Sequence, residues 1–335
     1  MVRHLDDVAR ERALPTVLTI HDYWSICARV QLIRPDGVRC EENMGGGCYL
    51  CVKERNLGGI EALKRLDSAV RPILSALSPG YAAVRDRHEV VLSAYRQADL
   101  RISPSRFLRS KLVDTAGFKP ETFLFSDNGM RTDSLLGFAK RPDPGGRVRF
   151  GFVGSLMWYK GTEIMLQAMK RLQGTRAVLS VHADFDPGRD PHHAALARLA
   201  GPNVAFRGRF DNADLAEVYA DLDVLLVPSI WWENSPITIH EAFLTGTPVV
   251  ASGIGGMAEY VRDEIDGLHF AAGDDRDLAA KMRRFLDEPG LAAKLAQAAP
   301  PIKTIAQDAE ATETRYRALC CIVREPVGRP NEARA

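Results

Sequence analysis

Two glutamates in the second half of the chain have the spacing needed to bind a ligand that carries both hydroxyls and phosphates. Glu233 and Glu241 lie eight positions apart, on either side of the start of an expected helix. Ser235 is suited to cap that helix, and Pro236 to be its first residue. The free N–H groups and the dipole of the helix would then point into the loop that carries Glu233. Carboxylates accept hydrogen bonds from hydroxyls, and a helix N-terminus attracts anions.

A lysine and two glycine-containing loops could complete this site. The expected strand at 148–153 leads into Gly154 and then to Lys160, just before a helix. Gly154 permits a tight turn, and Lys160 would place a cation beside a bound anion. The loop at 252–257, SGIGGM, could cradle a phosphate with its amides. Each feature alone is equally well explained as a solvated lysine or a flexible connection, so their joint order along the chain is what favours a site.

The other residues of this region also have ordinary structural explanations. Acidic side chains mostly lie on solvated faces, and either glutamate taken alone favours that explanation. Glu241 differs because its expected helix is short and largely apolar. The adjacent Trp231 and Trp232 are predicted to belong to the core or to an interface rather than to contact a ligand.

Composition limits the class of protein. The chain has 335 residues, enough for two domains, with 46% hydrophobic and 26% charged residues. Its formal net charge of +1 gives no global attraction for nucleic acid. We find no apolar run of about 18 residues that could span a membrane, and no apolar signal-peptide region near the start. We expect a cytoplasmic protein, with peripheral contact at the inner face of the plasma membrane as an open alternative.

The second half alternates short strands with amphipathic helices after a linker at 141–147, RPDPGGR. This alternation predicts an α/β fold with a parallel sheet covered on both faces, in which ligands bind at the carboxyl ends of the strands. The expected strands are 148–153, 178–182, 203–206, 224–228 and 249–252. The expected helices are 162–172, 192–199, 214–220, 236–244, 257–261 and 277–286.

The first half has fewer regular elements. A strand is expected at 16–20, ending at His21, and a loop rich in glycine and cysteine follows to about residue 59. Helices are then expected at 60–77, at 82–98, and from Ser103-Pro104 to just before Gly117, with strands at 99–103 and 123–125.

Four motifs in the second half, taken in order, carry a family resemblance. They are FGFVGSLMWYKG, NVAFRGRF, DVLLVPSIWWENSPITIHEAFLTGTPVVAS and GIGGMAEYVRDEIDGLHF, within about 147–284. This part resembles the nucleotide-sugar-binding domain of retaining glycosyltransferases of family 4. The resemblance implies the GT-B fold, with two Rossmann-like domains facing a cleft.

The resemblance also implies roles for individual residues. Glu241 would hold the ribose hydroxyls, and Glu233 would face the transferred sugar. Lys160 would be the cation for the diphosphate. Many relatives have arginine directly after the glycine of the first motif, and Ser155 stands there in this chain, which implies one phosphate cation fewer. The implied donor-binding set is Gly154, Ser155, Lys160, Asn234, Ser235, Glu241, Gly255 and Gly256.

The first half resembles the family only from its middle onwards. TIHDYW resembles the strand end of the acceptor domain, which implies that His21 lies near the donor sugar; the alternative is a strand-end histidine held by local hydrogen bonds. About 20 residues precede His21, too few for the opening βα units of relatives, which need roughly 30 residues each. We therefore expect an incomplete acceptor domain at 1–140, a nucleotide-sugar domain at 141–300, a terminal helical segment at 301–325 that packs back toward the first domain, and a disordered tail at 326–335.

The resemblance implies a retaining, metal-independent transfer of a sugar from a UDP- or GDP-sugar to a glycan or lipid-linked acceptor, in surface polysaccharide or glycolipid assembly. A cluster of basic residues at 85–111 would be a solvated helix face, or else a contact for anionic lipid. The alternative function is a non-catalytic nucleotide-sugar-binding or scaffold protein that needs a protein partner to complete its first domain.

The six cysteines include a group of four in the first half. Cys48 and Cys51 have the spacing of a metal knuckle, and Cys27 and Cys40 lie upstream. Four thiolates could form a tetrahedral structural zinc site, and free thiols are the alternative.

Overall fold

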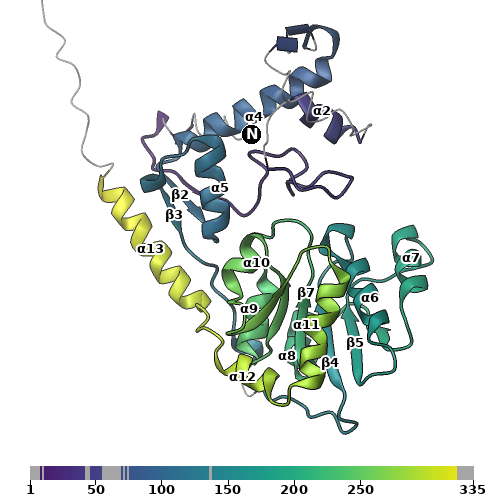
Figure 1. Ribbon diagram of the computed structural model, residues 1–335. Helices are drawn as coiled ribbons and strands as arrows, with labels where there is room; N and C mark the ends of the chain where they lie inside the picture. The colour runs from purple at the N-terminus through teal and green to yellow at the C-terminus, as the bar shows by residue number, and fades with distance from the viewer. Residues whose placement is uncertain are drawn as a thin grey trace, which may run out of the picture.

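The chain forms two parallel sheets on either side of residues 141–147, as the computed structural model shows (Figure 1). The structure describes residues 8–9, 11–41, 46–54, 69–70, 72–73, 75–135 and 138–322. The first sheet has the order β1-β2-β3 and contains β1 (Val17–Thr19), β2 (Leu100–Ser103) and β3 (Phe123–Phe125). All three expected strands of the first half are therefore present, with ends that differ by at most one residue.

Three described helices accompany the first sheet: α2 (Gly46–Val52), α4 (Pro79–Gln97) and α5 (Arg106–Ala116). The expected helix at 60–77 lies largely outside the described residues. The expected helix start at Ser103-Pro104 was wrong by two residues. The hydroxyl of Ser105 caps α5 by accepting from the amide of Leu108 at 3.0 Å, and Gly117, at φ 66°, ends it.

The second sheet has six parallel strands in the order β6-β5-β4-β7-β8-β9. Its strands are β4 (Val148–Val153), β5 (Ala177–His182), β6 (Val204–Phe206), β7 (Val224–Val227), β8 (Val249–Ser252) and β9 (Gly267–Phe270). Five of the six match the expected strands, and β9 was not predicted. This is the doubly wound order in which the chain reverses direction across the sheet between β4 and β7.

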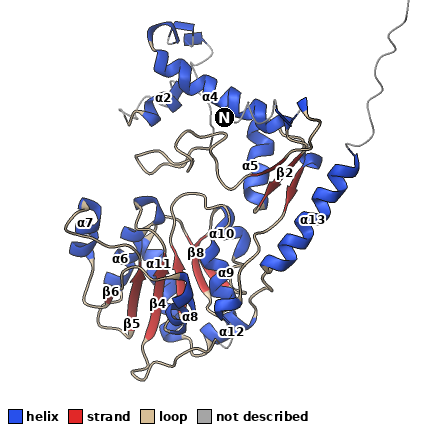
Figure 2. Ribbon diagram, turned by 180° about the vertical axis from the view of Figure 1, so that it is seen from behind, coloured by secondary structure: helices blue, strands red, loops and turns tan. Residues whose placement is uncertain are grey.

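Helices cover both faces of this sheet, which explains why its strands are rich in apolar residues (Figure 2). Along β7 the side chains alternate between two cores. Val224 and Leu226 face one core, and Leu225 and Val227 face the other. The helices are α6 (Thr162–Arg171), α7 (Pro191–Leu199), α8 (Leu215–Ala220), α9 (Ile237–Leu244), α10 (Gly255–Tyr260), α11 (Asp275–Asp287) and α12 (Leu291–Gln297). Short 3₁₀ helices lie at Pro120–Thr122, Asp133–Leu135, Trp158–Lys160 and Asn212–Asp214.

The last helix, α13 (Ile305–Ile322), runs alongside the first domain (Figure 1). Its start is fastened to the segment that leaves β3. The amide of Met130 donates to the carbonyl of Lys303 at 2.8 Å, and the amide of Ile305 donates to the carbonyl of Met130 at 2.9 Å. The ammonium of Lys303 donates to the carbonyl of Asp127 at 3.0 Å. The tail predicted at 326–335 lies outside the described residues, and none of the described helices is long and apolar enough to cross a membrane.

Candidate functional site

A cavity of about 290 Å³ lies at the carboxyl ends of β4 and β7, where the strand order of the second sheet reverses. Crevices at this position are the usual ligand sites of doubly wound sheets. The residues that line it come from both strand ends, from the loop after β7 and from the start of α9. They are Phe152, Val153, Gly154, Lys160, Leu226, Val227, Ser229, Glu233, Ser235, Pro236, Ile237 and Thr238.

The polar centre of the cavity is an ion pair between Lys160 and Glu233. The ammonium of Lys160 lies 2.7 Å from Oε1 of Glu233, with 28% and 8% of the two side chains exposed. The same oxygen accepts from the hydroxyl of Ser229 at 2.6 Å and from the indole N–H of Trp231 at 2.9 Å. Three donors therefore fix the carboxylate. The predicted meeting of Lys160 and Glu233 is confirmed, whereas the contributions of Ser229 and Trp231 were not predicted.

Two glycines shape the backbone around this centre. Gly154 has φ 150° and donates its amide to the carbonyl of His182 at 3.1 Å, which turns the chain away from β4. Gly161 has φ 73°, and a Cβ there would lie 1.9 Å from the carbonyl oxygen of Pro228. Only glycine fits this contact, so Gly161 sets how near Lys160 comes to the end of β7.

The start of α9 differs from the prediction. The helix begins at Ile237, one residue later than expected, and Pro236 precedes it without a side-chain cap. Ser235 does not cap the helix, because its hydroxyl accepts from the amide nitrogen of the Asn128 side chain at 3.0 Å. Ser235 still lines the cavity, and its bond instead ties the cavity wall to the segment that follows β3.

Asn234 connects the two domains rather than facing the cavity. Its side-chain N–H donates to the carbonyl of His21 at 2.9 Å, and its side-chain oxygen accepts from the hydroxyl of Ser105. Both of its functional groups are therefore used within the protein, and its donor-binding role stays a prediction. The side chain of His21 is exposed, and its backbone is held beside the loop that carries Glu233.

The glycines of the SGIGGM loop serve close packing. The amide of Gly256 donates to the carbonyl of Glu233 at 2.7 Å, and a Cβ at this residue would lie 1.6 Å from the carbonyl oxygen of Asn234. Gly255 has φ 58° and packs against the backbone of Trp232. The amide of Gly256 is thus engaged within the protein, and the role of this loop in holding a phosphate stays a prediction. Ser155 is exposed and does not line the cavity.

Glu241 lies on α9, one turn beyond Thr238, and is not among the residues that line the cavity. Its carboxylate accepts from the hydroxyl of Tyr219 at 3.0 Å. Burial raises the pKa of Glu241, while the bond from Tyr219 and the nearby His240 act in the opposite direction. A half-buried carboxylate whose hydrogen bond comes from a neutral group is costly to keep charged. This arrangement suits a carboxylate that also binds a ligand.

Replacing Glu241 with alanine should weaken nucleotide binding by about 1–3 kcal/mol, because charge-assisted bonds to ribose hydroxyls would be lost. Isothermal titration calorimetry measures the change. Glu264, exposed and paired with Arg284, provides a matched control whose alanine variant should bind as the wild type does. An unchanged dissociation constant for Glu241→Ala would count against the ribose assignment.

The substitution Glu241→Gln should make the folded protein more stable at neutral pH. Folding raises the pKa of Glu241. At pH values between its unfolded-state and folded-state pKa, the group therefore binds more protons in the folded than in the unfolded protein. The carboxyl group of Glu241 therefore stabilises the folded protein at pH values below its unfolded-state pKa of about 4.3. This contribution is lost as the pH rises through the folded-state pKa. Urea unfolding at several pH values should show the advantage of Glu241→Gln growing over this window. Equal stabilities at every pH would contradict the effect of burial.

The domains are also held together by Glu259 of α10, a residue that the sequence did not suggest. Its two carboxylate oxygens accept from the amides of Arg106 and Phe107 at 2.9 and 2.8 Å, at the start of α5. A negative charge at a helix N-terminus is stabilising. Beside this contact, Trp232 packs against Phe107 with ring centroids 5.9 Å apart, which agrees with its prediction as a core or interface residue.

Replacing Glu259 with alanine should lower the free energy of unfolding by about 1–2 kcal/mol, because two amides of α5 lose their acceptor. Denaturant unfolding measures this loss. The control is Glu288→Ala, which removes an exposed surface pair with Arg284 and should change stability by less than about 0.5 kcal/mol. Equal losses for the two variants would show that the contact with α5 does not hold the domains.

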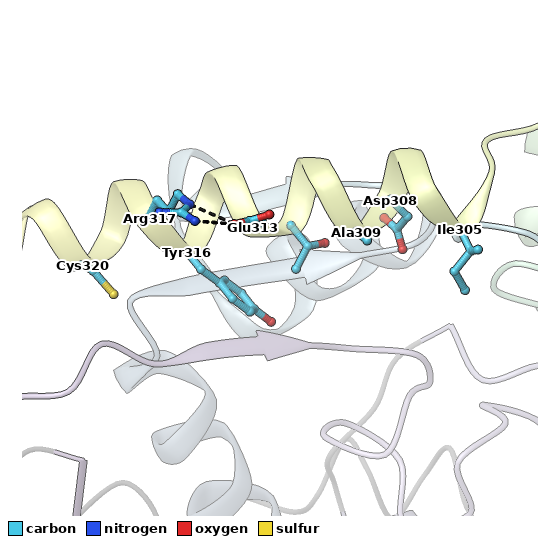
Figure 3. A pocket seen from close by; sticks show the side chains of 8 residues that line it. Ile305, Asp308, Ala309, Glu313, Tyr316, Arg317 and Cys320 are labelled. Carbon is cyan, nitrogen blue, oxygen red and sulfur yellow. Dashed lines mark hydrogen bonds and ion pairs between the residues drawn. The ribbon is translucent and has the colours of Figure 1, made fainter.

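A larger hollow, of about 640 Å³, runs along α13 (Figure 3). Its lining is largely apolar and includes Ile305 and Tyr316, whose ring points from the helix into the hollow. Its arginine, Arg317, is already paired with Glu313, with Nε and Oε1 3.0 Å apart. The hollow therefore suits apolar side chains better than a diphosphate.

Comparison with known proteins agrees with this geometry. Residues 137–301 match the family model of glycosyl transferases group 1. These residues include all six strands of the second sheet. The 2-deoxystreptamine glucosyltransferase of Streptomyces kanamyceticus is 37% identical over 151 residues, which cover 44% of this chain and 38% of the relative. The glycogen synthase of Mycobacterium tuberculosis is 28% identical over 225 residues, 65% of this chain and 53% of the relative. The chain thus spans about half, or less, of the length of these relatives.

Solved structures confirm the GT-B fold. Anabaena HepE in complex with UDP and glucose superposes with a TM-score of 0.60 at 20% identity, over 69% of this chain and 67% of that one. A glycosyltransferase from Rickettsia africae gives 0.59 at 18% identity, over 66% and 64%. The second domain contains a six-stranded sheet, whereas the first domain contains three described strands.

Proposed function

We propose that this protein transfers a sugar from a nucleotide diphosphate sugar to an acceptor hydroxyl. One observation carries the proposal: a buried carboxylate and a partly exposed ammonium form an ion pair in a cavity at the switch point of a doubly wound sheet. The family match of residues 137–301 and the complex of Anabaena HepE with UDP and glucose support the same class of donor.

In the proposed mechanism, Lys160 stabilises the departing diphosphate. Its ammonium is held 2.7 Å from Glu233 and would be shared with, or transferred to, the incoming phosphate oxygens. Glu233 would then orient the donor sugar, together with His21 from the first domain, while Glu241 holds the ribose. The hydrogen bonds from Ser229 and Trp231 would keep the Glu233 carboxylate fixed during this exchange.

We infer that the transfer retains the anomeric configuration. This part of the proposal depends on the family resemblance. An oxygen of the leaving diphosphate would take the proton of the acceptor hydroxyl on the face from which the diphosphate departs, and the acceptor oxygen would bond to the anomeric carbon on that same face. Lys160 supplies the positive charge, so the proposed chemistry needs no catalytic metal. Proton NMR of the first product formed, before any later equilibration, would show an inverted configuration if this inference is wrong.

We propose a glycan or lipid-linked acceptor, of the kind used in surface polysaccharide or glycolipid assembly, at the inner face of the plasma membrane. The basic residues at 85–111 support a membrane contact only in part, because several of them already form hydrogen bonds within the protein. Arg101 donates to the carbonyl of Tyr95 at 2.8 Å, and Lys111 donates to the carbonyl of Glu41 at 3.0 Å. Sedimentation with anionic and neutral lipid vesicles separates a membrane contact from a purely solvated face.

A panel of UDP-, GDP- and ADP-sugars tests the function. Calorimetry identifies the base, and release of nucleoside diphosphate in the presence of candidate acceptors measures turnover. Binding of at least one donor with turnover supports the transferase. Failure of every donor to bind contradicts it.

A second candidate, a nucleotide-sugar-binding or scaffold protein that needs a protein partner, is favoured by the small first sheet. β1 lies at one edge of this sheet, and an apolar hollow lies along α13. Tight donor binding without turnover, restored when a partner is added, would favour this candidate over the single-chain enzyme.

A further inference from the structure

Two clusters of titratable side chains lie outside the cavity. The first consists of half-buried cysteines of the first domain, namely Cys27, Cys40, Cys48 and Cys51. Among the described residues, no group of three or more His, Cys, Asp or Glu side chains is placed to hold a metal ion, so structural zinc at these cysteines stays a prediction. The second cluster surrounds His240 of α9, where the second domain meets the segment that follows β3.

His240 is fully buried, and both of its ring nitrogens face acceptors. Nε2 lies 3.1 and 3.0 Å from the two carboxylate oxygens of Asp127. Nδ1 lies 3.2 Å from the carbonyl oxygen of Pro236, at the start of the same helix. A carbonyl oxygen and an ionised carboxylate can only accept hydrogen bonds. Both ring nitrogens therefore need a proton to make these bonds, and the ring that makes both of them is an imidazolium.

Asp127 is held in its charged form. Its Oδ1 accepts from the hydroxyl of Tyr260 at 2.7 Å and from the amide of Asn128 at 2.8 Å; the same hydroxyl also contacts the carbonyl of Pro104. Burial raises the pKa of Asp127, but the bonds from His240, Tyr260 and Asn128 outweigh burial and lower this pKa. Burial raises the pKa of Tyr260, so its hydroxyl keeps its proton and donates it.

The pair of His240 and Asp127 joins one wall of the cavity to the connecting segment, as we call residues 126–130. Pro236, which accepts from the ring, lines the cavity, and so does Ser235, whose hydroxyl accepts from the side chain of Asn128. Two adjacent residues of the connecting segment, at 127 and 128, therefore hold the start of α9. The titratable groups around the ring are Asp127 of the connecting segment, Glu241 of α9 and Tyr260 of α10, with Lys303 donating to the carbonyl of Asp127 at 3.0 Å.

The charge of the ring also acts on its neighbour in sequence, Glu241. Burial raises the pKa of Glu241, and the bond from Tyr219 and the charge of His240 oppose this rise. A neutral ring would remove the positive charge and leave the effect of burial with less opposition. The imidazolium therefore favours the carboxylate form of Glu241, which is the form that accepts hydrogen bonds from ligand hydroxyls.

We propose that His240 is a positioning residue of the donor site and that it acts as a buried imidazolium. The ring fixes the start of α9 to the connecting segment, and its charge keeps Glu241 ionised for the ligand. This inference deepens the proposed function and rests on it, because Glu241 is there assigned to the ribose. When the ring loses a proton to solvent, either Asp127 or the carbonyl of Pro236 loses its hydrogen bond. Donor affinity should therefore fall as the ring loses its proton.

Nitrogen-15 NMR of the full chain, labelled at histidine, tests the protonation state. The signals of His240 are those that are lost in His240→Gln or, where that variant does not fold, those that shift most in Asp127→Asn. We expect both ring nitrogens of His240 to carry protons at neutral pH in the protein without ligand. A neutral ring at this pH, with one nitrogen unprotonated, would overturn the proposal.

Calorimetry with UDP, GDP and ADP tests the link to the donor site. At neutral pH, His240→Gln should weaken binding of the nucleotide that the wild type binds most tightly by about tenfold, a usual size for coupling between two sites. The ratio of the two dissociation constants should fall over the pH range in which NMR shows the wild-type ring losing its proton. A ring with a purely structural role would give the same ratio throughout that range, and this result would overturn the proposal.

The control is His193→Gln, which removes a half-buried histidine of α7 whose Nε2 lies 3.9 Å from the carboxylate of Asp190. This variant should bind the nucleotide as the wild type does. Asp127→Asn is the second test variant, because it keeps the shape of the side chain and removes the charge that the ring faces. It should also weaken nucleotide binding, so the test does not depend on whether His240→Gln folds.

The outcomes separate this inference from the proposed function. Wild-type affinity in a folded His240→Gln or Asp127→Asn at neutral pH would overturn the role of His240 and leave the transferase proposal standing. Failure of the wild type to bind any of the three nucleotides would contradict the proposed function, and the role of His240 at the donor site with it.

Discussion

Replacing Lys160 with alanine should lower the rate of donor turnover by about 10²–10³-fold, the usual loss when one group that stabilises developing negative charge is removed. The side chain is partly exposed to the cavity and is held by Glu233, so it is available to a diphosphate without rearrangement of the backbone. Initial rates of nucleoside diphosphate release measure the effect. Lys170→Ala, on the exposed face of α6, the helix that follows Lys160, is the matched control and should keep full activity.

The variant Lys160→Ala also leaves a buried carboxylate without its cation, which could lower activity through stability alone. The double variant Lys160→Ala, Glu233→Gln separates the two causes, because a neutral amide needs no cation. If the loss comes from the missing charge at the diphosphate, the double variant regains stability but not turnover. Wild-type turnover by Lys160→Ala would remove this residue from the mechanism.

Replacing Gly161 with alanine should lower the free energy of unfolding by about 3–4 kcal/mol and also reduce donor turnover. The added Cβ would lie 1.9 Å from the carbonyl oxygen of Pro228, a backbone atom at the end of β7. Relief of this clash must move α6 away from β7 and thereby separate Lys160 from Glu233. Urea unfolding and the same rate assay measure the two effects.

Gly174 provides the control for backbone strain. Its φ of 77° is close to the 73° of Gly161, but a Cβ at Gly174 would meet nothing within 4 Å. Gly174→Ala should therefore cost only about 1 kcal/mol, the penalty of a left-handed alanine, and leave turnover unchanged. Equal losses for the two variants would mean that the close approach between the ends of β4 and β7 has no energetic role.

The parallel sheet of the second half could be predicted from sequence because its strands are continuous apolar runs between glycine and polar turns. The strands β4 and β8 were predicted with the observed bounds. The strand β9 was missed because Gly267–Phe270 is short, begins with glycine and includes a histidine. Its assignment depends on pairing with β8, which no local pattern reveals.

The meeting of Lys160 and Glu233 could also be predicted, because both follow strands whose carboxyl ends share one edge of the sheet. The local partners of these residues could not. Ser235 has the type of an N-cap, but a side chain from the other domain, Asn128, binds its hydroxyl instead. Sequence spacing describes neighbours along the chain, whereas this bond joins residues 107 positions apart.

The contacts between the domains were the least predictable part. Asn234 had been expected to face a ligand, and Glu259 had drawn no attention. In the structure, both join the donor-side loops to the first domain, through His21 and the start of α5. Tertiary contacts of this kind depend on how two separately folded sheets meet, and a polar side chain in a loop is equally compatible with a ligand or with another domain.

A crystal structure of the protein with the nucleoside diphosphate that binds most tightly tests the central claim most directly. The account predicts electron density for the diphosphate in the cavity between the ends of β4 and β7, with a phosphate oxygen about 2.7–3.2 Å from the ammonium of Lys160. Density in the hollow along α13, or anywhere else on the protein while this cavity stays empty, would contradict it.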